Sequence, residues 1–225
     1  MTDKFDSTPT LDTLLNPRSI RKFTDEAISE PTLTAILQAG QAASTSSFLQ
    51  AVSVIRITDP KKRQQLRQIA SGLSADAYKT ALDEGKRVGH GYVEECAEFL
   101  VFCMDSHRHH ALAPDAQLDW TEVSLIGAID TAIFAQNVLA AAESLGLGGV
   151  YIGGIRNDIT ATTDILTLPR YVVPLFGMCL GHPNWEHPVN NSIRPRLPLD
   201  AILSTNTYTP ASSDVLSLIH ISEPT

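Results

Sequence analysis

Residues 140–157, AAAESLGLGGVYIGGIRN, place the most unusual demands on the backbone of this chain. An alanine-rich helix is expected to end at Leu145, because Gly146 has the position and type of a left-handed residue just past a helix end. Val150 to Ile152 is β-branched and aromatic, which predicts a short strand. Gly153-Gly154 ends that strand without side chains. A tight connection explains this pattern, and so does a planar ligand lying against bare backbone.

A Rossmann-type phosphate turn does not fit these glycines. Its fingerprint requires glycine at the first, third and sixth places, and the sixth place counted from Gly146 is Tyr151. It must also follow a strand and open a helix, whereas here the order is reversed. A ligand in this region is therefore not held by a Rossmann turn.

Composition predicts a single acidic domain. The 225 residues are 43% hydrophobic, enough for one core, and the net charge of −8 disfavours a nucleic-acid partner. Cys96, Cys103 and Cys179 have no CxxC spacing, which favours buried thiols in a reducing, cytoplasmic setting over a disulfide framework or a zinc site. The N-terminus lacks a signal-peptide pattern, and polar residues interrupt the most apolar stretch, so no membrane span is predicted.

Apolar spacing and cap residues predict the order of helices and strands. Asn16-Pro17 should end a first short helix, Ser29 should cap a helix reaching about Ala43, and Asp59-Pro60 should open another. The long apolar stretch predicts a helix from Thr121 to Leu145. Strands are expected at Val52–Ile57, at Glu98–Met104 with both faces buried, and at Tyr171–Leu180, and a short helix capped by Asn157 or Asp158 should run to Leu168.

Two arginine-bearing loops are candidate anion sites. In an extended Arg18-Ser19-Ile20-Arg21 segment, alternation would turn Ser19 and Arg21 away from a buried Ile20. In Arg194-Pro195-Arg196, the proline holds two guanidinium groups apart, and such groups suit phosphate because each donates two hydrogen bonds. Solvated basic loops would have the same composition. Together the pairs suggest one phosphate held from two loops.

Three further polar clusters have weaker functional interpretations. Ser44 to Ser47 carries four hydroxyl groups that could bond a ligand or simply end a helix. The run Lys61-Lys62-Arg63 with Arg67 is expected to be a solvated helix face. Asp105 to His110 contains three histidines, but a polar loop after a strand is a poor metal site, so no metal is expected.

The helix over 121–145 is apolar on nearly every face. A helix of this kind must be covered on all sides, and a single domain of this size seldom provides that cover. A subunit interface along this helix is therefore expected.

Five segments together resemble the nitroreductase family of FMN proteins, in its branch of NADPH-dependent, oxygen-insensitive nitroreductases and flavin reductases. The resemblance covers about Leu11 to Pro210. The segments are RSIRKFT at 18–24, STSSFLQ at 44–50, ESLGLGGVYIGGIRN at 143–157, PLFGMCLG at 174–181 and RPRLP at 194–198.

The resemblance implies an α+β fold, with a mixed sheet flanked by helices, and an obligate homodimer with FMN at the interface. Residues 1–211 would form the FMN-binding domain. The FMN phosphate and ribityl end would be held by Arg18, Ser19, Arg21, Arg194 and Arg196, with Ile20 and Pro195 in the same two loops. Tyr151, Ile152, Gly153 and Gly154 would lie along the isoalloxazine ring, and Thr45 keeps the hydroxyl that a serine often supplies in relatives.

The implied activity is NAD(P)H oxidoreduction by two-electron exchange. NADPH would deliver a hydride to flavin N5, and a nitroaromatic, quinone or free flavin would then remove it, so no catalytic side chain is needed. The alternatives are a flavin reductase that supplies reduced FMN to a partner, a flavin-binding protein without turnover, and a metal protein using His107 to His110.

The chain departs from the family pattern at four places. Pro17 replaces a frequent histidine, residues 72–89 resemble an insertion, and His90 stands where relatives have a flavin-contacting glutamine. Residues 212–225 have an atypical composition and are expected to be a truncated, non-native tail that diverges near Val215. Weak NADPH preference would follow, because relatives continue with a segment that helps bind NADPH.

Overall fold

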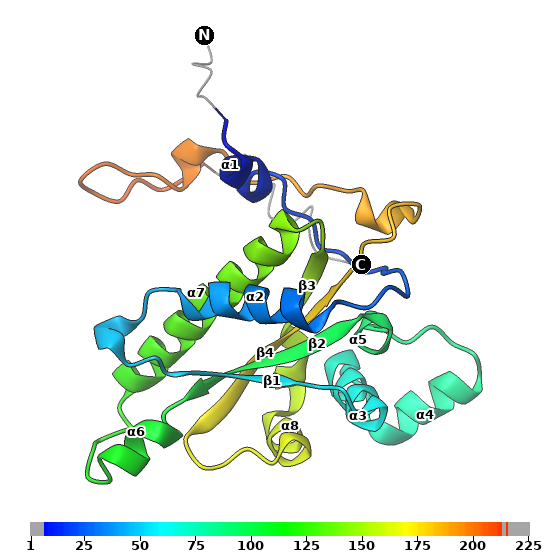
Figure 1. Cartoon of the computed structure of the whole chain (residues 1–225), viewed down its shortest axis with the longest axis horizontal. Helices are drawn as coiled ribbons and strands as arrows, with labels where there is room; N and C mark the ends of the chain where they lie inside the picture. The colour runs from blue at the N-terminus through cyan, green and yellow to red at the C-terminus, as the bar shows by residue number, and fades with distance from the viewer. Residues whose placement is uncertain (1–6, 213–214, 216–225) are drawn as a thin grey trace.

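A computed structural model describes residues 7–212 and residue 215. The expected tail beyond Val215, like residues 213–214, lies outside the described residues. The described chain forms a four-stranded sheet with helices on both faces (Figure 1). The α+β prediction is therefore confirmed.

The sheet is antiparallel and has the strand order β1-β2-β4-β3. Its strands are β1 (Val52–Arg56), β2 (Glu98–Asp105), β3 (Gly148–Ile152) and β4 (Val172–Gly181). The expectation of a mixed sheet was wrong for these strands. Among residues 7–212, parallel pairing is confined to one isolated bridge between Ser19 and Gly149, because the 18–23 segment pairs too briefly to form a strand.

Strand β2 separates two hydrophobic cores. Phe99, Val101 and Cys103 face one core, and Leu100 and Phe102 face the other. Successive side chains point to opposite faces of a strand, so an apolar run that alternates between two cores must be covered on both sides. The prediction that this strand is buried on both faces is confirmed.

Helices α2 (Glu30–Gln41) and α7 (Thr121–Ser144) cover one face of the sheet (Figure 1). The predicted cap Ser29 accepts the backbone N–H of Thr32. By length and composition α7 could cross a membrane, but core helices pass the same test. In this fold one side of α7 packs in the core, while Leu125, Ile129 and Ile133 are exposed on another side.

The other face is covered by α3 (Pro60–Ser71), α5 (Tyr92–Glu95) and α8 (Ile159–Leu166). Asp59 and Asp158 accept backbone N–H groups at the starts of α3 and α8, so both predicted caps are confirmed. The remaining helices are α1 (Pro9–Leu14), α4 (Ala75–Asp83) and α6 (His107–Leu112), with the short 3-10 helices η1 (Ser46–Phe48), η2 (Gly153–Asp158), η3 (Pro188–Asn190) and η4 (Leu199–Ala201).

Two local predictions were wrong. The segment after β2, expected to be a polar loop, forms helix α6, in which the Nε2 of His109 lies 2.8 Å from the carbonyl oxygen of Leu49. The basic run on α3 is only partly solvated. Arg63 donates to the carbonyls of Ile57 and Cys96, and Arg67 donates to that of Val88. These side chains fold back over backbone carbonyl groups that need hydrogen-bond donors.

The three cysteines are free and buried, as predicted. Within residues 7–212 and 215, no group of three or more His, Cys, Asp or Glu side chains is arranged to hold a metal ion.

Candidate functional site

The two predicted arginine loops meet at one pocket. Its volume is about 230 Å³, and it is lined by Arg18, Ser19, Arg21, Arg194 and Arg196. Strand β3 and helix α7 form its other walls, with Tyr151, Gln136, Leu139 and Glu143 among the lining residues. We call this cavity the arginine pocket. Segments almost 180 positions apart in the sequence thus place four guanidinium groups around one space.

The first loop is held by its buried isoleucine. The backbone N–H of Ile20 donates to the carbonyl of Gly149 at 2.9 Å, and its side chain is only 2% exposed. A Cβ atom on Gly148 would lie 2.4 Å from Ile20 Cγ1, so only glycine admits this contact. Ile20 therefore faces the core, while Ser19 and Arg21 line the pocket, which is the predicted alternation.

Asn190 joins the first loop to the second and has no obvious sequence signal. It is 1% exposed. Its Oδ1 accepts the backbone N–H of Arg21 at 3.0 Å, and its Nδ2 donates to the carbonyls of Lys22 at 2.7 Å and Asn184 at 2.8 Å. An asparagine in a proline-bearing loop usually indicates only a turn, so its function as a bridge could not be predicted from local pattern.

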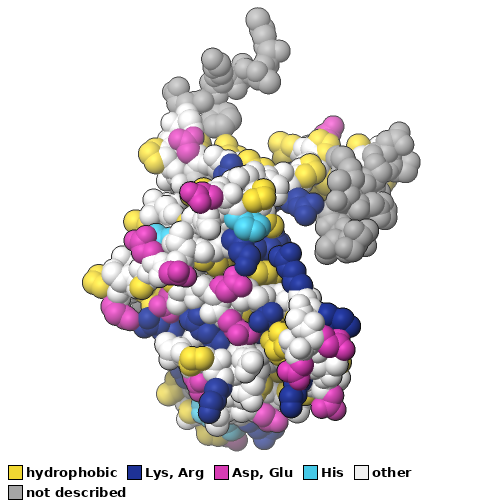
Figure 2. Space-filling model, turned by 90° about the vertical axis from the view of Figure 1, so that its right-hand side faces the viewer, with side chains coloured by type: hydrophobic (Ala, Val, Ile, Leu, Met, Phe, Trp, Pro, Cys, Tyr) yellow, Lys and Arg dark blue, Asp and Glu magenta, His cyan; other side chains and the backbone are white. Residues whose placement is uncertain are grey.

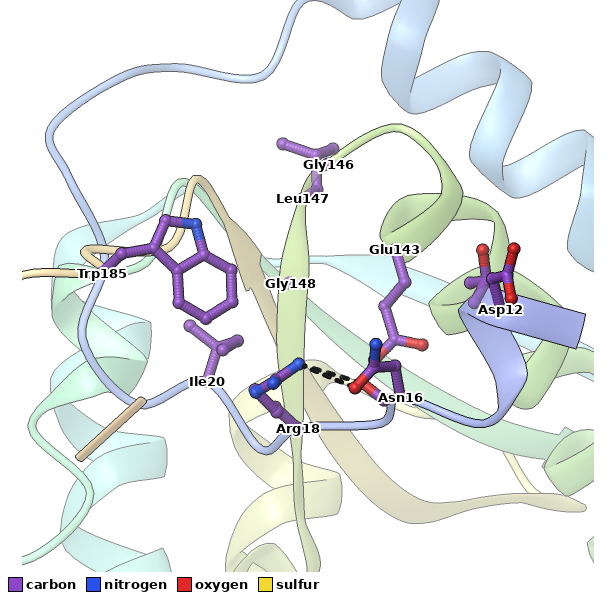
Figure 3. A pocket seen from close by; sticks show the side chains of 10 residues that line it. Asp12, Asn16, Arg18, Ile20, Glu143, Gly146, Leu147, Gly148 and Trp185 are labelled. Carbon is purple, nitrogen blue, oxygen red and sulfur yellow. Dashed lines mark hydrogen bonds between the residues drawn. The ribbon is translucent and has the colours of Figure 1, made fainter. Parts of the chain in front are cut away.

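Arg18 lies between two cavities. Figure 3 shows the second one, about 320 Å³, in which Arg18 lies near the Trp185 ring and donates to Asn16. Its guanidinium carbon is 5.9 Å from the Trp185 ring centroid, within the range of a cation–π contact. These contacts hold the side chain at the rim of the arginine pocket.

Glu143 is a carboxylic acid in a pocket that four arginine side chains line. Burial raises the pKa of its carboxyl group, and a hydrogen bond from the backbone of Arg18 opposes that shift. Burial, and secondarily the Glu143 charge, raises the pKa of Tyr151 to about 12. Tyr151 is therefore a neutral donor at physiological pH, and its hydroxyl lies 3.3 Å from Gln136 Oε1.

The glycines that end β3 have different surroundings. A Cβ on Gly153 would lie 3.1 Å from the end of the Arg156 side chain, whose guanidinium donates to the carbonyl of Leu175. A Cβ on Gly154 would lie 2.5 Å from the backbone oxygen of Ala70 in α3. Gly154 thus has a packing reason to be glycine. Ile152 is fully buried, and neither it nor the two glycines lines the arginine pocket.

Thr45 does not line the arginine pocket. The next residue, Ser46, donates its N–H to both carboxylate oxygens of buried Asp130, at 3.0 and 3.2 Å. The pocket residue Leu139 lies nine positions further along α7, or about 13 Å along the helix axis. Ser47, Phe48 and Gln50 all have positive φ angles, of 48°, 59° and 53°. Such strain in non-glycine residues is concentrated at functional segments.

A family model described as the nitroreductase family matches residues 15–182. The chain is 48% identical to an NADPH-flavin oxidoreductase of Vibrio harveyi over 199 residues, which are 88% of this chain and 74% of that protein. It is 44% identical to an oxygen-insensitive NADPH nitroreductase of Salmonella typhimurium over 209 residues, 93% of this chain and 78% of that protein.

The fold is similar to a solved structure described as an NADPH:FMN oxidoreductase from Vibrio harveyi complexed with NAD+. The TM-score is 0.80 at 46% sequence identity, and the match covers 93% of this chain and 82% of that one.

Proposed function

This chain belongs to the nitroreductase family and is an NADPH-dependent oxidoreductase, and we propose that it uses FMN to reduce nitroaromatics, quinones or free flavins by two electrons. The arginine pocket is the observation that carries this proposal. Four arginines on two loops joined by Asn190 make a site for a phosphate monoester, which FMN carries.

The donors of the pocket fit the polar end of FMN. Arg194 and Arg196 would bind the phosphate, and Arg18 and Arg21 would add charge on the opposite loop. The hydroxyl groups of Ser19 and Ser192 would bond the ribityl chain. Tyr151, with its hydroxyl near Gln136, would cover one side of the ring. Hydrogen-bond donors would thus surround the charged phosphate end of FMN, and the apolar surface along β3 would lie beside its ring. This distribution matches a ligand with one charged end and one apolar end.

Bound FMN would supply the site that accepts a hydride from NADPH and passes it to the second substrate. The contribution of this chain is then positioning and electrostatics. The cationic side chains place positive charge beside the cofactor, and buried Ile20 holds the first arginine loop in place through its hydrogen bond to Gly149. No side chain is required to act as a nucleophile or general base.

We also propose that the enzyme is a homodimer that packs through α7. Leu125, Ile129 and Ile133 are spaced by four residues and are 53%, 54% and 41% exposed. They form one stripe on the helix, because residues four apart share a face. An apolar cavity of about 310 Å³ beside them, lined by Leu49, Leu112 and Ile126 among others, extends this surface.

A dimer would also explain the position of Thr45. The strained 45–50 segment is bonded to α7, because the Ser46 N–H donates to Asp130. Asp130 follows Ile129 on the helix, so the segment lies beside the exposed stripe. In a dimer built on that stripe, Thr45 of the partner subunit would approach the ring end of FMN in the first subunit. Cytoplasmic localisation, with neither nucleic acid nor membrane as a partner, completes the proposal.

Anaerobic reduction tests the function. The purified protein should be yellow, should bleach when NADPH is added without oxygen, and should recover its colour when nitrofurazone follows. A yellow protein that NADPH does not bleach would be a flavin-binding protein without turnover. Steady-state rates with FMN and with nitrofurazone as acceptors then separate a flavin reductase from a nitroreductase.

A further inference from the structure

The excursion at residues 72–89 builds a second cationic pocket beside the arginine pocket. This cavity is about 340 Å³, and the charged side chains that line it are Arg21, Lys22, Arg67, Lys86, Arg87 and Glu95. We call it the excursion pocket. Figure 2 views the molecule from the side of α3, α4 and α5, where Lys and Arg side chains lie among Asp and Glu side chains. The volume of the excursion pocket suits a small organic ligand.

The excursion is held firmly by Arg67. This guanidinium donates to the carbonyls of Val88 at 3.0 Å and Gly89 at 3.3 Å, and to Glu94 at 2.9 Å. The guanidinium carbon of Arg67 also lies 5.8 Å from the ring centroid of buried Tyr78 on α4. The segment that carries Lys86 and Arg87 is therefore docked on α3, and both cations are presented at a defined rim.

Carboxylates neutralise only part of the charge. Lys22 pairs with Glu95 at 2.7 Å, Arg67 with Glu94 and Lys86 with Glu84. Among the described residues, Arg21 and Arg87 have no carboxylate within 4 Å. The Lys86–Glu84 pair joins exposed side chains two positions apart in the sequence, so it contributes little and exchanges readily with a ligand. The pocket therefore keeps an excess of positive charge.

Histidine does not supply this charge. Burial, with the neighbouring charges of Arg21 and Arg67, lowers the pKa of His90. Its Nδ1 lies 2.7 Å from the Tyr92 hydroxyl. The neutral ring and the phenol thus form an uncharged wall, and an anion in the pocket would be held by the lysine and arginine side chains.

Arg21 connects the two cavities, because it lines both. A group bound in the excursion pocket is then separated by one side chain from the proposed FMN site. A substrate that must reach FMN would place a charged substituent at this distance from it.

We propose that the excursion pocket binds an anionic substituent, a carboxylate or a phosphate, of a substrate that exchanges electrons with FMN. The proposal rests on the proposed function, because it takes FMN to occupy the arginine pocket. It assigns Lys86 and Arg87 to the selection of anionic substrates over neutral ones of the same shape.

Equilibrium binding tests the site without turnover. Isothermal titration calorimetry on the FMN-loaded protein would compare 4-nitrobenzoate with 4-nitrobenzamide, and NADP+ with NAD+. Each pair differs chiefly by one anionic group. At least one pair should show about tenfold tighter binding of the more anionic member, the size expected for a hydrogen bond to a charged group. The double variant Lys86→Ala/Arg87→Ala should lose that preference.

The matched control is Lys61→Ala/Lys62→Ala. It removes the same charge from the first turn of α3, outside the excursion pocket, and should keep the wild-type preference. Loss of preference for the nitrobenzoate pair would identify an acceptor carboxylate as the ligand, and loss for the dinucleotide pair would identify the 2′-phosphate. An unchanged preference in the excursion variant, or no preference in the wild type for either pair, would overturn the proposal.

Kinetics separate this inference from the proposed function. If NADPH fails to bleach the flavin but the binding preference depends on Lys86 and Arg87, the reductase proposal fails and the anion site stands. The other outcome is rapid turnover, with the same ratio of kcat/KM for 4-nitrobenzoate to kcat/KM for 4-nitrobenzamide in the wild type, the excursion variant and the control. In that case the reductase proposal stands, and the binding preference measured by calorimetry decides the anion site.

Discussion

Asn190 Oδ1 accepts the backbone N–H of Arg21 at 3.0 Å, although 169 positions separate the two residues. The same amide donates to the carbonyls of Lys22 and Asn184 and is almost fully buried. Because one side chain satisfies the backbone of the first arginine loop and of Asn184, in the stretch that leads to the second, the relative position of the two loops depends on it.

Asn190→Ala should lower the free energy of unfolding by about 2–4 kcal/mol, since it leaves several partly buried backbone groups without partners. It should also weaken FMN binding, because the two loops lose their connection. Urea denaturation and FMN titration measure the two effects. The control Asn191→Ala removes an exposed asparagine with a single 3.3 Å bond to the Trp185 carbonyl. Equal effects of both variants would contradict the bridging function.

Arg21→Ala and Arg196→Ala should each weaken FMN binding by about 1.5–3 kcal/mol, the range for a lost hydrogen bond to a charged group. Quenching of FMN fluorescence on binding gives the dissociation constants. Arg170→Ala is the control, because Arg170 stacks on Tyr171 and does not line the arginine pocket. Unchanged affinity in both pocket variants would remove the phosphate assignment.

Glu143→Gln should change the pH dependence of stability. Burial raises the pKa of Glu143 in the folded state, so its stabilising effect is present below the ordinary carboxyl pKa and is lost as the pH rises through the raised value. The variant should therefore gain stability relative to the wild type between pH 4 and pH 8. Thermal unfolding midpoints across this range measure the difference, and parallel curves would refute it.

Gly153→Val and Gly154→Ala should separate ligand binding from packing. A Cβ at 153 would meet only the end of the Arg156 side chain. The family resemblance places the isoalloxazine ring along Gly153, so Gly153→Val should cost bound flavin more than it costs folding. A Cβ at 154 would press on the Ala70 backbone, so even Gly154→Ala should destabilise the fold, by about 1–3 kcal/mol. Flavin content and urea midpoints compare the two. Equal loss of flavin and stability in Gly153→Val would leave Gly153 a structural residue.

Ile129→Arg should disrupt the proposed dimer, because it places a charge in the centre of the exposed stripe on α7. Light scattering coupled to size exclusion should then give the monomer mass at micromolar concentration, against a dimer for the wild type. Leu82→Arg, at an exposed apolar position on α4, should leave the mass unchanged. A wild-type monomer would refute the interface, and the FMN site would have to be complete in one subunit.

Local features were predictable because their causes are local. Ser29, Asp59 and Asp158 cap helices through side-chain bonds within three residues. Gly146 has a φ of +80°, which its place after Leu145 indicated. The alternation of Ser19, Ile20 and Arg21 follows from extended backbone geometry, so the orientation of the first arginine loop was predictable as well.

The sequence by itself determined the caps of α2, α3 and α8, the strand buried on both faces and the residue types suited to a phosphate, because each depends on neighbours within a few positions. The tertiary structure alone decided that the sheet is antiparallel, that Asn190 joins the arginine loops, that Arg63 and Arg67 fold inward, and that the excursion places Lys86 and Arg87 beside Arg21. Such pairings are set by how the whole chain buries apolar area and satisfies its backbone polar groups, and residues far apart in sequence contribute to that balance together.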